Sequence, residues 1–87
     1  MTKMTSKRIR QEFAEQLKKE FLPGTRIRLL QMGEDPYPVP PGSLGTVTSV
    51  DDLGTIHMRW DCGSSLGLIV DEDLFEVIGK AGDHHDA

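Results

Sequence analysis

One stretch decides the fold of this chain: Met32-Gly-Glu-Asp-Pro-Tyr-Pro-Val-Pro-Pro-Gly-Ser-Leu-Gly-Thr-Val-Thr-Ser-Val-Asp-Asp-Leu-Gly-Thr-Ile-His-Met-Arg-Trp-Asp-Cys-Gly63. It holds four of the five prolines and the only Trp, Tyr and Cys. Proline lacks the amide donor that a central strand needs, so residues 33–43 should form a loop with extended, polyproline-like pieces. The second half alternates apolar and polar residues on both sides of residues 51–54, where Gly54 can supply a positive φ. The stretch therefore predicts a stiff loop that leads into a β-hairpin.

Further short strands are predicted around this hairpin, which gives five in total, at 25–32, 45–50, 55–60, 65–70 and 75–78. In the third strand, Ile56, Met58 and Trp60 fall on one face, as in strands with one buried side. Trp60 is therefore interpreted as a core residue and not as a platform for base stacking. Five short strands in about 55 residues, with a long first loop and tight later turns, predict a small closed or half-closed barrel.

The hairpin resembles SH3-like barrels of the KOW type, in which a glycine precedes a Val-x-x-Val strand. Here Gly45, Val47, Val50 and Gly54 take those places. The predicted fold class is mainly β with one N-terminal α-helix, built as a small five-stranded SH3-like barrel. The chain would divide into an amphipathic helix over 1–23, the barrel over 24–79 and a disordered polar tail over 80–87.

The helix is predicted from an apolar stripe on a charged segment that ends at Pro23-Gly24. The stripe consists of Ile9, Phe13, Leu17 and Phe21, which recur every four residues. This stripe must be buried somewhere. It can pack on the barrel of its own chain, pair two copies as a homodimer, or fill a groove in a partner protein, and the sequence leaves these alternatives open.

Charge is unevenly distributed over the 87 residues, which carry a net charge of −4. Residues 1–22 hold six basic and three acidic side chains, whereas residues 24–79 hold three basic and nine acidic ones. The body should therefore repel phosphate, and only the helix should attract it. No apolar run is long enough to span a bilayer and no secretory signal is visible, so we expect a protein that does not enter a membrane. One cysteine cannot form an internal disulfide, which fits a cytoplasmic location.

The proline-rich loop is the best candidate for a binding site. We predict that it contacts a partner through Asp35, Pro36, Tyr37, Pro38, Pro40 and Pro41. Prolines stiffen the loop and lower the entropy cost of binding, and Tyr37 offers an amphipathic contact. In SH3-like barrels this is also the position of a ligand-binding loop. The competing interpretation is a rigid loop that only covers one end of a thin core.

A nucleic-acid-binding surface is the alternative hypothesis. It would use the basic residues of the helix and strands, namely Lys7, Arg8, Arg10, Lys18, Arg26, Arg28 and Arg59. It predicts an affinity that falls steeply with salt, because phosphate binding releases counterions. Salt bridges to Asp51, Asp52 and Asp61 are the plainer interpretation of the strand arginines, and the acidic body favours it.

Nothing in the sequence has the pattern of a catalytic, metal or cofactor site. No nucleophile with its base, paired carboxylates or phosphate-binding glycine loop is visible, so we predict no enzymatic activity and no cofactor. The residues His57, Cys62, His84 and His85 lack zinc-ligand spacing. The acidic turn at 71–73 does not match a calcium loop and is interpreted as solvated.

A closer resemblance covers most of the predicted barrel. It lies in Gly24-Thr-Arg-Ile-Arg-Leu-Leu-Gln-Met32, Asp35-Pro-Tyr-Pro-Val-Pro-Pro-Gly42, Gly45-Thr-Val47, Val50-Asp-Asp-Leu-Gly54, Trp60-Asp-Cys-Gly63 and Ser65-Leu66. These motifs resemble an uncharacterised bacterial family, domain of unknown function 4314, and leave out the basic helix and the tail. The resemblance implies a small cytoplasmic protein of phages or conjugative elements of Gram-positive bacteria. It implies no activity, cofactor or catalytic residue.

The leading interpretation is a non-enzymatic binding module of a phage or mobile element, with a protein as its partner. One refinement is an inhibitor of a host defence system, because an acidic body can mimic nucleic acid.

Overall fold

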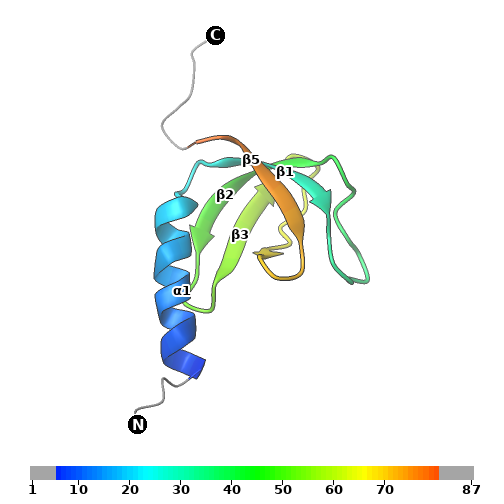
Figure 1. The fold of residues 1–87 in the computed structure, drawn as a ribbon. Helices are drawn as coiled ribbons and strands as arrows, with labels where there is room; N and C mark the ends of the chain where they lie inside the picture. Colours follow the sequence, from blue (N-terminus) through cyan, green and yellow to red (C-terminus); the bar gives the residue numbers. More distant parts are fainter. Residues whose placement is uncertain (1–5, 81–87) are drawn as a thin grey trace.

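The computed structural model describes residues 6–80, with side chains from Gln11 onward. It contains α1 (Ser6–Glu20), β1 (Arg26–Gln31), β2 (Leu44–Val50), β3 (Thr55–Trp60), β4 (Leu68–Ile69) and β5 (Leu74–Gly79), shown in Figure 1. The predicted class, mainly β with one N-terminal helix and five strands, is confirmed for this part of the chain. The predictions for residues 81–87, including His84 and His85, lie outside the described residues.

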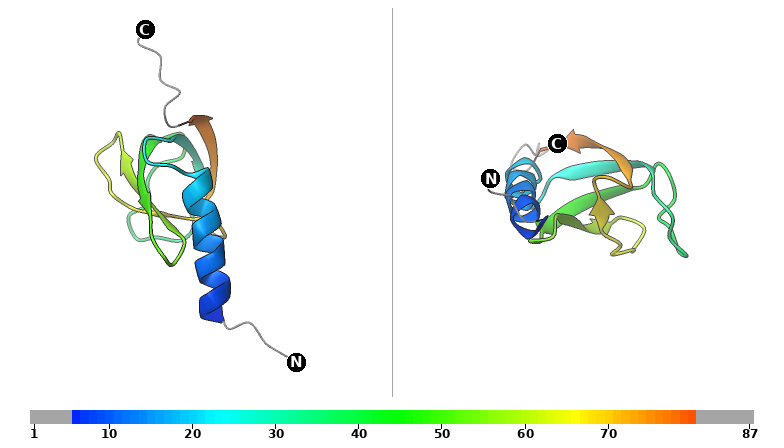
Figure 2. Two further views of the ribbon diagram at one scale, coloured as in Figure 1. Left: turned by 90° about the vertical axis from the view of Figure 1, so that its left-hand side faces the viewer. Right: turned by 60° about the horizontal axis from the view of Figure 1, so that its bottom comes forward.

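The strands form one antiparallel sheet in the order β4-β3-β2-β1-β5, which is not closed into the predicted barrel. Only residues 70–73 separate the two edge strands. Five Cα steps reach at most about 18 Å, whereas a flat sheet would hold the edges about 19 Å apart. The link is also folded into a turn, because the amides of Glu72 and Asp73 both donate to the Ile69 carbonyl at 2.9 Å. The sheet must therefore curl, as Figure 2 shows.

Three register shifts fall within the strands that curl. One lies between Val47 and Ser49 in the pairing of β2 with β3. The other two lie in the pairing of β1 with β5. One falls between Arg26 and Ile27, and the other between Leu29 and Gln31, where Leu30 has no opposite residue. Irregularities of this kind bend a strand and increase its twist. They help to bring the edges of the sheet toward each other.

The core lies inside this curl. Its buried side chains are Leu17, Ile27, Leu29, Val39, Val47, Val50, Ile56, Met58, Trp60 and Leu68. Trp60 is a core residue as predicted, and its indole Nε1 donates to the Leu66 carbonyl at 2.8 Å. Gly45 lies directly beneath it, because a Cβ there would sit 2.6 Å from Trp60 Cε3. Only glycine allows the indole to lie this close to β2.

The C-terminal part of the apolar helix stripe packs on the sheet of its own chain, which was one of the three alternatives that the sequence left open. Ala14 and Leu17 are buried. Phe21 meets Phe75 of β5 edge-to-face, with ring centroids 5.8 Å apart. Phe13 stays 43% exposed. No helix among residues 6–80 is long and apolar enough to cross a membrane.

The fourth strand is much shorter than the predicted 65–70. The amide of Leu66 donates to the Ser64 hydroxyl at 3.1 Å, and the Leu66 carbonyl accepts the indole of Trp60. These local bonds compete with strand pairing. Gly67 then passes close to β3, where a Cβ would lie 2.8 Å from Thr55 Cγ2. Ladder pairing starts only at Leu68.

Candidate functional site

The proline-rich loop, residues 33–43, is fastened to the sheet at both ends. At its start, the amide of Gly33 donates to Asp73 Oδ1 at 2.7 Å. At its end, the amide of Gly42 donates to the Leu29 carbonyl at 2.7 Å, and the Leu29 amide donates to the Ser43 carbonyl at 2.8 Å. Gly42 has a φ of +89°, which favours glycine at this return to the sheet. The loop therefore leaves and rejoins β1 and β2 at fixed points.

A third anchor lies in the middle of the loop. Val39 is buried in the core between prolines that are exposed. Its amide faces the Met32 sulfur at 3.5 Å, a weak acceptor. The sequence analysis did not single out Val39 as a core residue. The only available signal was that it is the one aliphatic residue within the run 34–41.

The tip of the loop presents an aromatic ring to solvent. Tyr37 is 86% exposed. Its amide donates to Asp35 Oδ1 at 2.8 Å, which makes a local turn of the kind that aspartate favours. Pro36, Pro38, Pro40 and Pro41 are all exposed around it. The structure thus gathers the six predicted contact residues on one projecting loop, where they can offer an apolar and aromatic contact with few bonds left to rotate.

The basic residues of the alternative hypothesis do not form one free surface. Arg26 holds Asp61 with two hydrogen bonds of 2.9 and 2.8 Å and also donates to Thr46 Oγ1 at 2.9 Å. The hydrogen bond to Asp61 raises the pKa of Arg26, and Arg26 in turn lowers the pKa of Asp61. Arg28 pairs with Glu76 of β5 at 2.8 Å. Acidic neighbours therefore neutralise both arginines of β1.

The remaining basic residues lie apart from this pair. Lys18 pairs with Asp52 at the turn between β2 and β3, at 2.6 Å. Arg59 on β3 and Arg26 on β1 both stand opposite Thr46 of β2, so β2 lies between them. Arg59 has no ion pair with another described residue. The side chains of Lys7, Arg8 and Arg10 lie outside the described residues. The described part of the chain thus leaves Arg59 as the one unpaired arginine of the sheet.

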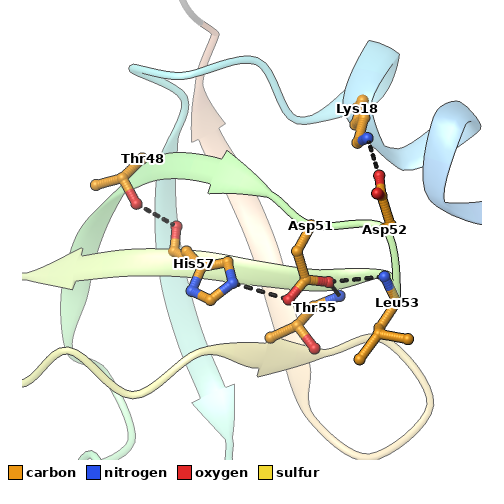
Figure 3. Close-up of polar contacts among 7 residues, drawn as sticks. All are labelled: Lys18, Thr48, Asp51, Asp52, Leu53, Thr55 and His57. Carbon is orange, nitrogen blue, oxygen red and sulfur yellow. Dashed lines mark hydrogen bonds and ion pairs between the residues drawn. The ribbon is translucent and has the colours of Figure 1, made fainter.

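The turn between β2 and β3 is tied together by its own polar side chains, as Figure 3 shows. Asp51 Oδ1 accepts the amides of Leu53 and Thr55, both at 2.9 Å, and its Oδ2 lies 2.9 Å from His57 Nε2. The bond from Thr55 is the main reason that the pKa of Asp51 is lowered, followed by contributions from His57 and Leu53. These groups hold the turn between β2 and β3 in place.

Asp73 was interpreted from the sequence as a solvated acidic residue, and the structure corrects this. It is only 7% exposed. Its two carboxylate oxygens accept the amides of Gly33 at 2.7 Å and Ile69 at 2.8 Å. This one side chain thus joins the start of the proline-rich loop to β4. Gly33 precedes Asp73 by 40 positions, so no local pattern could have revealed the contact.

No metal-binding arrangement is present within residues 6–80, because no three His, Cys, Asp or Glu side chains gather there. Cys62 is exposed and lies in the turn after β3. The buried side-chain polar atoms of the described residues all have hydrogen-bond partners.

Comparison with curated proteins and comparison with solved structures each gave no significant match. A family model described as "Domain of unknown function (DUF4314)" matches residues 10–78. The match spans the sheet up to the last residue but one of β5. It also covers most of α1, which the sequence analysis had left outside the resemblance. The resemblance predicted from the loop and strand motifs is confirmed, and this chain belongs to the DUF4314 family.

Proposed function

We propose that this protein is a non-enzymatic, protein-binding module of a phage or mobile element that acts in the cytoplasm. Its contact surface would be the tip of the proline-rich loop, made of Asp35, Pro36, Tyr37, Pro38, Pro40 and Pro41. One observation carries the proposal. Tyr37 is 86% exposed, yet it stands on a loop that is bonded to the sheet at both ends.

The arrangement suits recognition because most of the ordering is complete before a partner arrives. An immobilised, rotamer-rich side chain costs about 0.5–1.5 kcal/mol on binding. Prolines at four positions and the turn at Asp35 leave little backbone freedom to lose around Tyr37. Tyrosine also ranks among the residues that contribute most to protein interfaces. An exposed aromatic ring on such a loop favours a binding role over a mere cover for the core.

Charge favours a protein partner over nucleic acid. Arg26, Arg28 and Lys18 each hold a carboxylate, so contact with phosphate would first have to break these pairs. The family resemblance to phage and conjugative-element proteins supports the mobile-element setting. Inhibition of a host defence system is a refinement consistent with the acidic body, because acidic surfaces can occupy sites built for nucleic acid.

The test is affinity capture from a lysate of a Gram-positive host, with and without nuclease, read by mass spectrometry. Wild type is compared with a Tyr37→Ala and Asp35→Ala double variant, and with Leu22→Ala as a control that removes a half-exposed apolar side chain elsewhere. We expect a stoichiometric protein that survives nuclease, is lost with the double variant, and is kept with Leu22→Ala.

Two results would contradict the proposal. Equal capture by the double variant would mean that the loop tip is not the contact. Capture that disappears with nuclease and weakens steeply with salt would favour the nucleic-acid hypothesis instead.

A further inference from the structure

A groove runs beside the middle of α1, on the side of the sheet that carries β4. It has a volume of about 570 Å³ and is lined by Phe13, Leu53, Gly54, Thr55, Ile69, Val70, Asp71 and Glu72. Three of these residues are large apolar side chains left open to solvent: Phe13 is 43%, Leu53 70% and Ile69 43% exposed. They come from the helix, the hairpin turn and β4, so the fold brings together apolar residues that are far apart in sequence. Convergent exposed apolar groups of this kind indicate an interaction site.

The rim of the groove is acidic. Asp71 and Glu72 are exposed and make no side-chain hydrogen bond or ion pair with another described residue. They differ in this from Asp73, whose carboxylate is consumed by two backbone amides. An apolar floor with an unpaired acidic rim fits a segment that carries apolar and basic side chains together.

The chain itself contains such a segment. Residues 1–10 hold Lys3, Lys7, Arg8 and Arg10, with no acidic residue, and also Met1, Met4 and Ile9. The helix begins at Ser6, seven residues before Phe13, which approaches the hairpin turn at Gly54. At 1.5 Å per residue its first turns extend about 10 Å beyond that contact. Figures 1 and 2 show α1 projecting past the turn between β2 and β3.

We propose that two copies of this chain pair symmetrically, with residues 1–10 of each copy lying along the acidic groove of the other. Because the projecting helix end and the groove adjoin on each copy, one twofold axis can satisfy both contacts at once. Short helical segments are marginal in water unless they pack against another surface, so this contact would also stabilise the first turns of α1. The inference does not depend on the proposed role of the proline-rich loop, because the loop tip contributes nothing to the groove.

The paired state should be weak and sensitive to salt. The apolar contact is small compared with the roughly 1,200 Å² of buried surface at the low end of stable interfaces. Exposed opposite charges add to it only while they are not screened, and the Debye length falls from about 10 Å at 0.1 M salt to about 3 Å at 1 M. We therefore expect wild-type protein to be dimeric at low salt and high concentration and to dissociate as salt is added.

Two charge-reversed variants make the test specific. The groove variant carries Asp71→Lys and Glu72→Lys, and the helix variant carries Arg8→Glu and Arg10→Glu. The groove variant alone would place basic residues against basic residues in both contacts. The helix variant alone lowers the side-chain charge of residues 1–10 from +4 to zero and sets two carboxylates against the acidic rim. An equimolar mixture would place the basic segment of one copy in an acidic groove, and the introduced carboxylates of the other copy against the introduced lysines. Acidic residues near a helix N-terminus also interact favourably with its dipole, so the helix variant should not weaken α1.

The measurement is sedimentation equilibrium of each variant and of the mixture, with circular dichroism to check that all are folded. We expect the dimer dissociation constant to rise at least about tenfold for each variant alone, and to recover in the mixture. Glu34→Lys, an exposed reversal outside the groove, is the control and should leave dimerisation unchanged. A wild-type protein that stays monomeric at millimolar concentration and low salt would overturn the proposal. Variants that dimerise as wild type does, or a mixture that fails to recover, would overturn it as well.

Discussion

Two connections of the sheet, the turn between β2 and β3 and the proline-rich loop, use their side chains in opposite ways. In the turn, the Asp51 carboxylate accepts two backbone amides and meets His57, while Asp52 reaches Lys18 on the helix. At the tip of the loop, the one hydrogen bond among the described residues runs from the amide of Tyr37 to Asp35 Oδ1. The polar groups of the turn are thus engaged internally, whereas the tip of the loop faces solvent.

The difference separates stability from recognition. The turn stabilises the position of the helix and of two strands with its own side chains. The loop draws its order from outside the tip: from Asp73, from the burial of Val39, and from the pairing of Gly42 and Ser43 with Leu29. Substitutions of the anchoring residues, such as Asp73 and Val39, should therefore lower the free energy of unfolding. Substitutions at the tip should affect partner binding alone.

Asp73→Ala should have the largest effect. It leaves the amides of Gly33 and Ile69 without their acceptor, and an unsatisfied buried donor costs about 1–3 kcal/mol. We expect the free energy of unfolding to fall by about 2–4 kcal/mol, a large share of the roughly 5–15 kcal/mol that holds a typical domain together. Urea unfolding followed by the fluorescence of the buried Trp60 measures this directly.

The matched control for this prediction is Asp71→Ala, two positions earlier and exposed. It should change the free energy of unfolding by less than about 0.5 kcal/mol, as surface substitutions usually do. If both variants unfolded alike, the carboxylate of Asp73 would not join the loop to β4 in the way its contacts indicate.

Asp51→Ala should have the next largest effect. The turn loses the acceptor of two amides, as when a helix loses its N-cap, and such losses cost about 1–2 kcal/mol. Asp52→Ala is the comparison, because it removes only a surface ion pair with Lys18 and should cost less. Both values come from the same urea titrations. An Asp52→Ala variant that is the less stable of the two would mean that docking of the helix matters more than the turn.

The sequence was sufficient for the elements of the fold but not for its long-range contacts. Alternation placed Ile56, Met58 and Trp60 on the buried face of β3, and the proline pattern located the loop. Such patterns are local, so they can be recognised without knowing which segments meet. The shortening of β4 could not be predicted, because it depends on the indole of Trp60 reaching the carbonyl of Leu66.

The same limit applies to the candidate site. The exposure of Tyr37 and the turn at Asp35 follow from a short motif. The groove does not, because Phe13, Leu53 and Ile69 become neighbours only when the sheet curls and the helix docks. The curl in turn depends on register shifts within paired strands, and alternation along a single strand carries no information about these.

Acid should weaken the turn between β2 and β3. The pKa of Asp51 in the folded state lies below its ordinary value of 3.8. Its stabilising contribution is therefore complete above about pH 5 and is lost as the pH falls through 3.8 toward the lowered pKa. Asp61, whose pKa is lowered by Arg26, acts in the same direction. The free energy of unfolding, measured from pH 6 to pH 2.5, should depend less on pH for Asp51→Asn than for wild type.

Tyr37→Ala should have the smallest effect on folding and so gives the sharpest test of the comparison. Its ring is 86% exposed, so we expect the free energy of unfolding to change by less than about 0.5 kcal/mol. Val39→Ala, two residues along, removes two buried methyl groups and should cost about 2 kcal/mol. We expect partner binding to fall at least about tenfold in the tyrosine variant. In the valine variant, binding should fall only as far as the folded fraction of the protein falls. Together these results would mean that the tip recognises the partner and that the buried Val39 holds the tip in place. Equal destabilisation by both substitutions would mean that Tyr37 and Val39 both serve to cover the core. The tip would then have no separate role in contacting a partner.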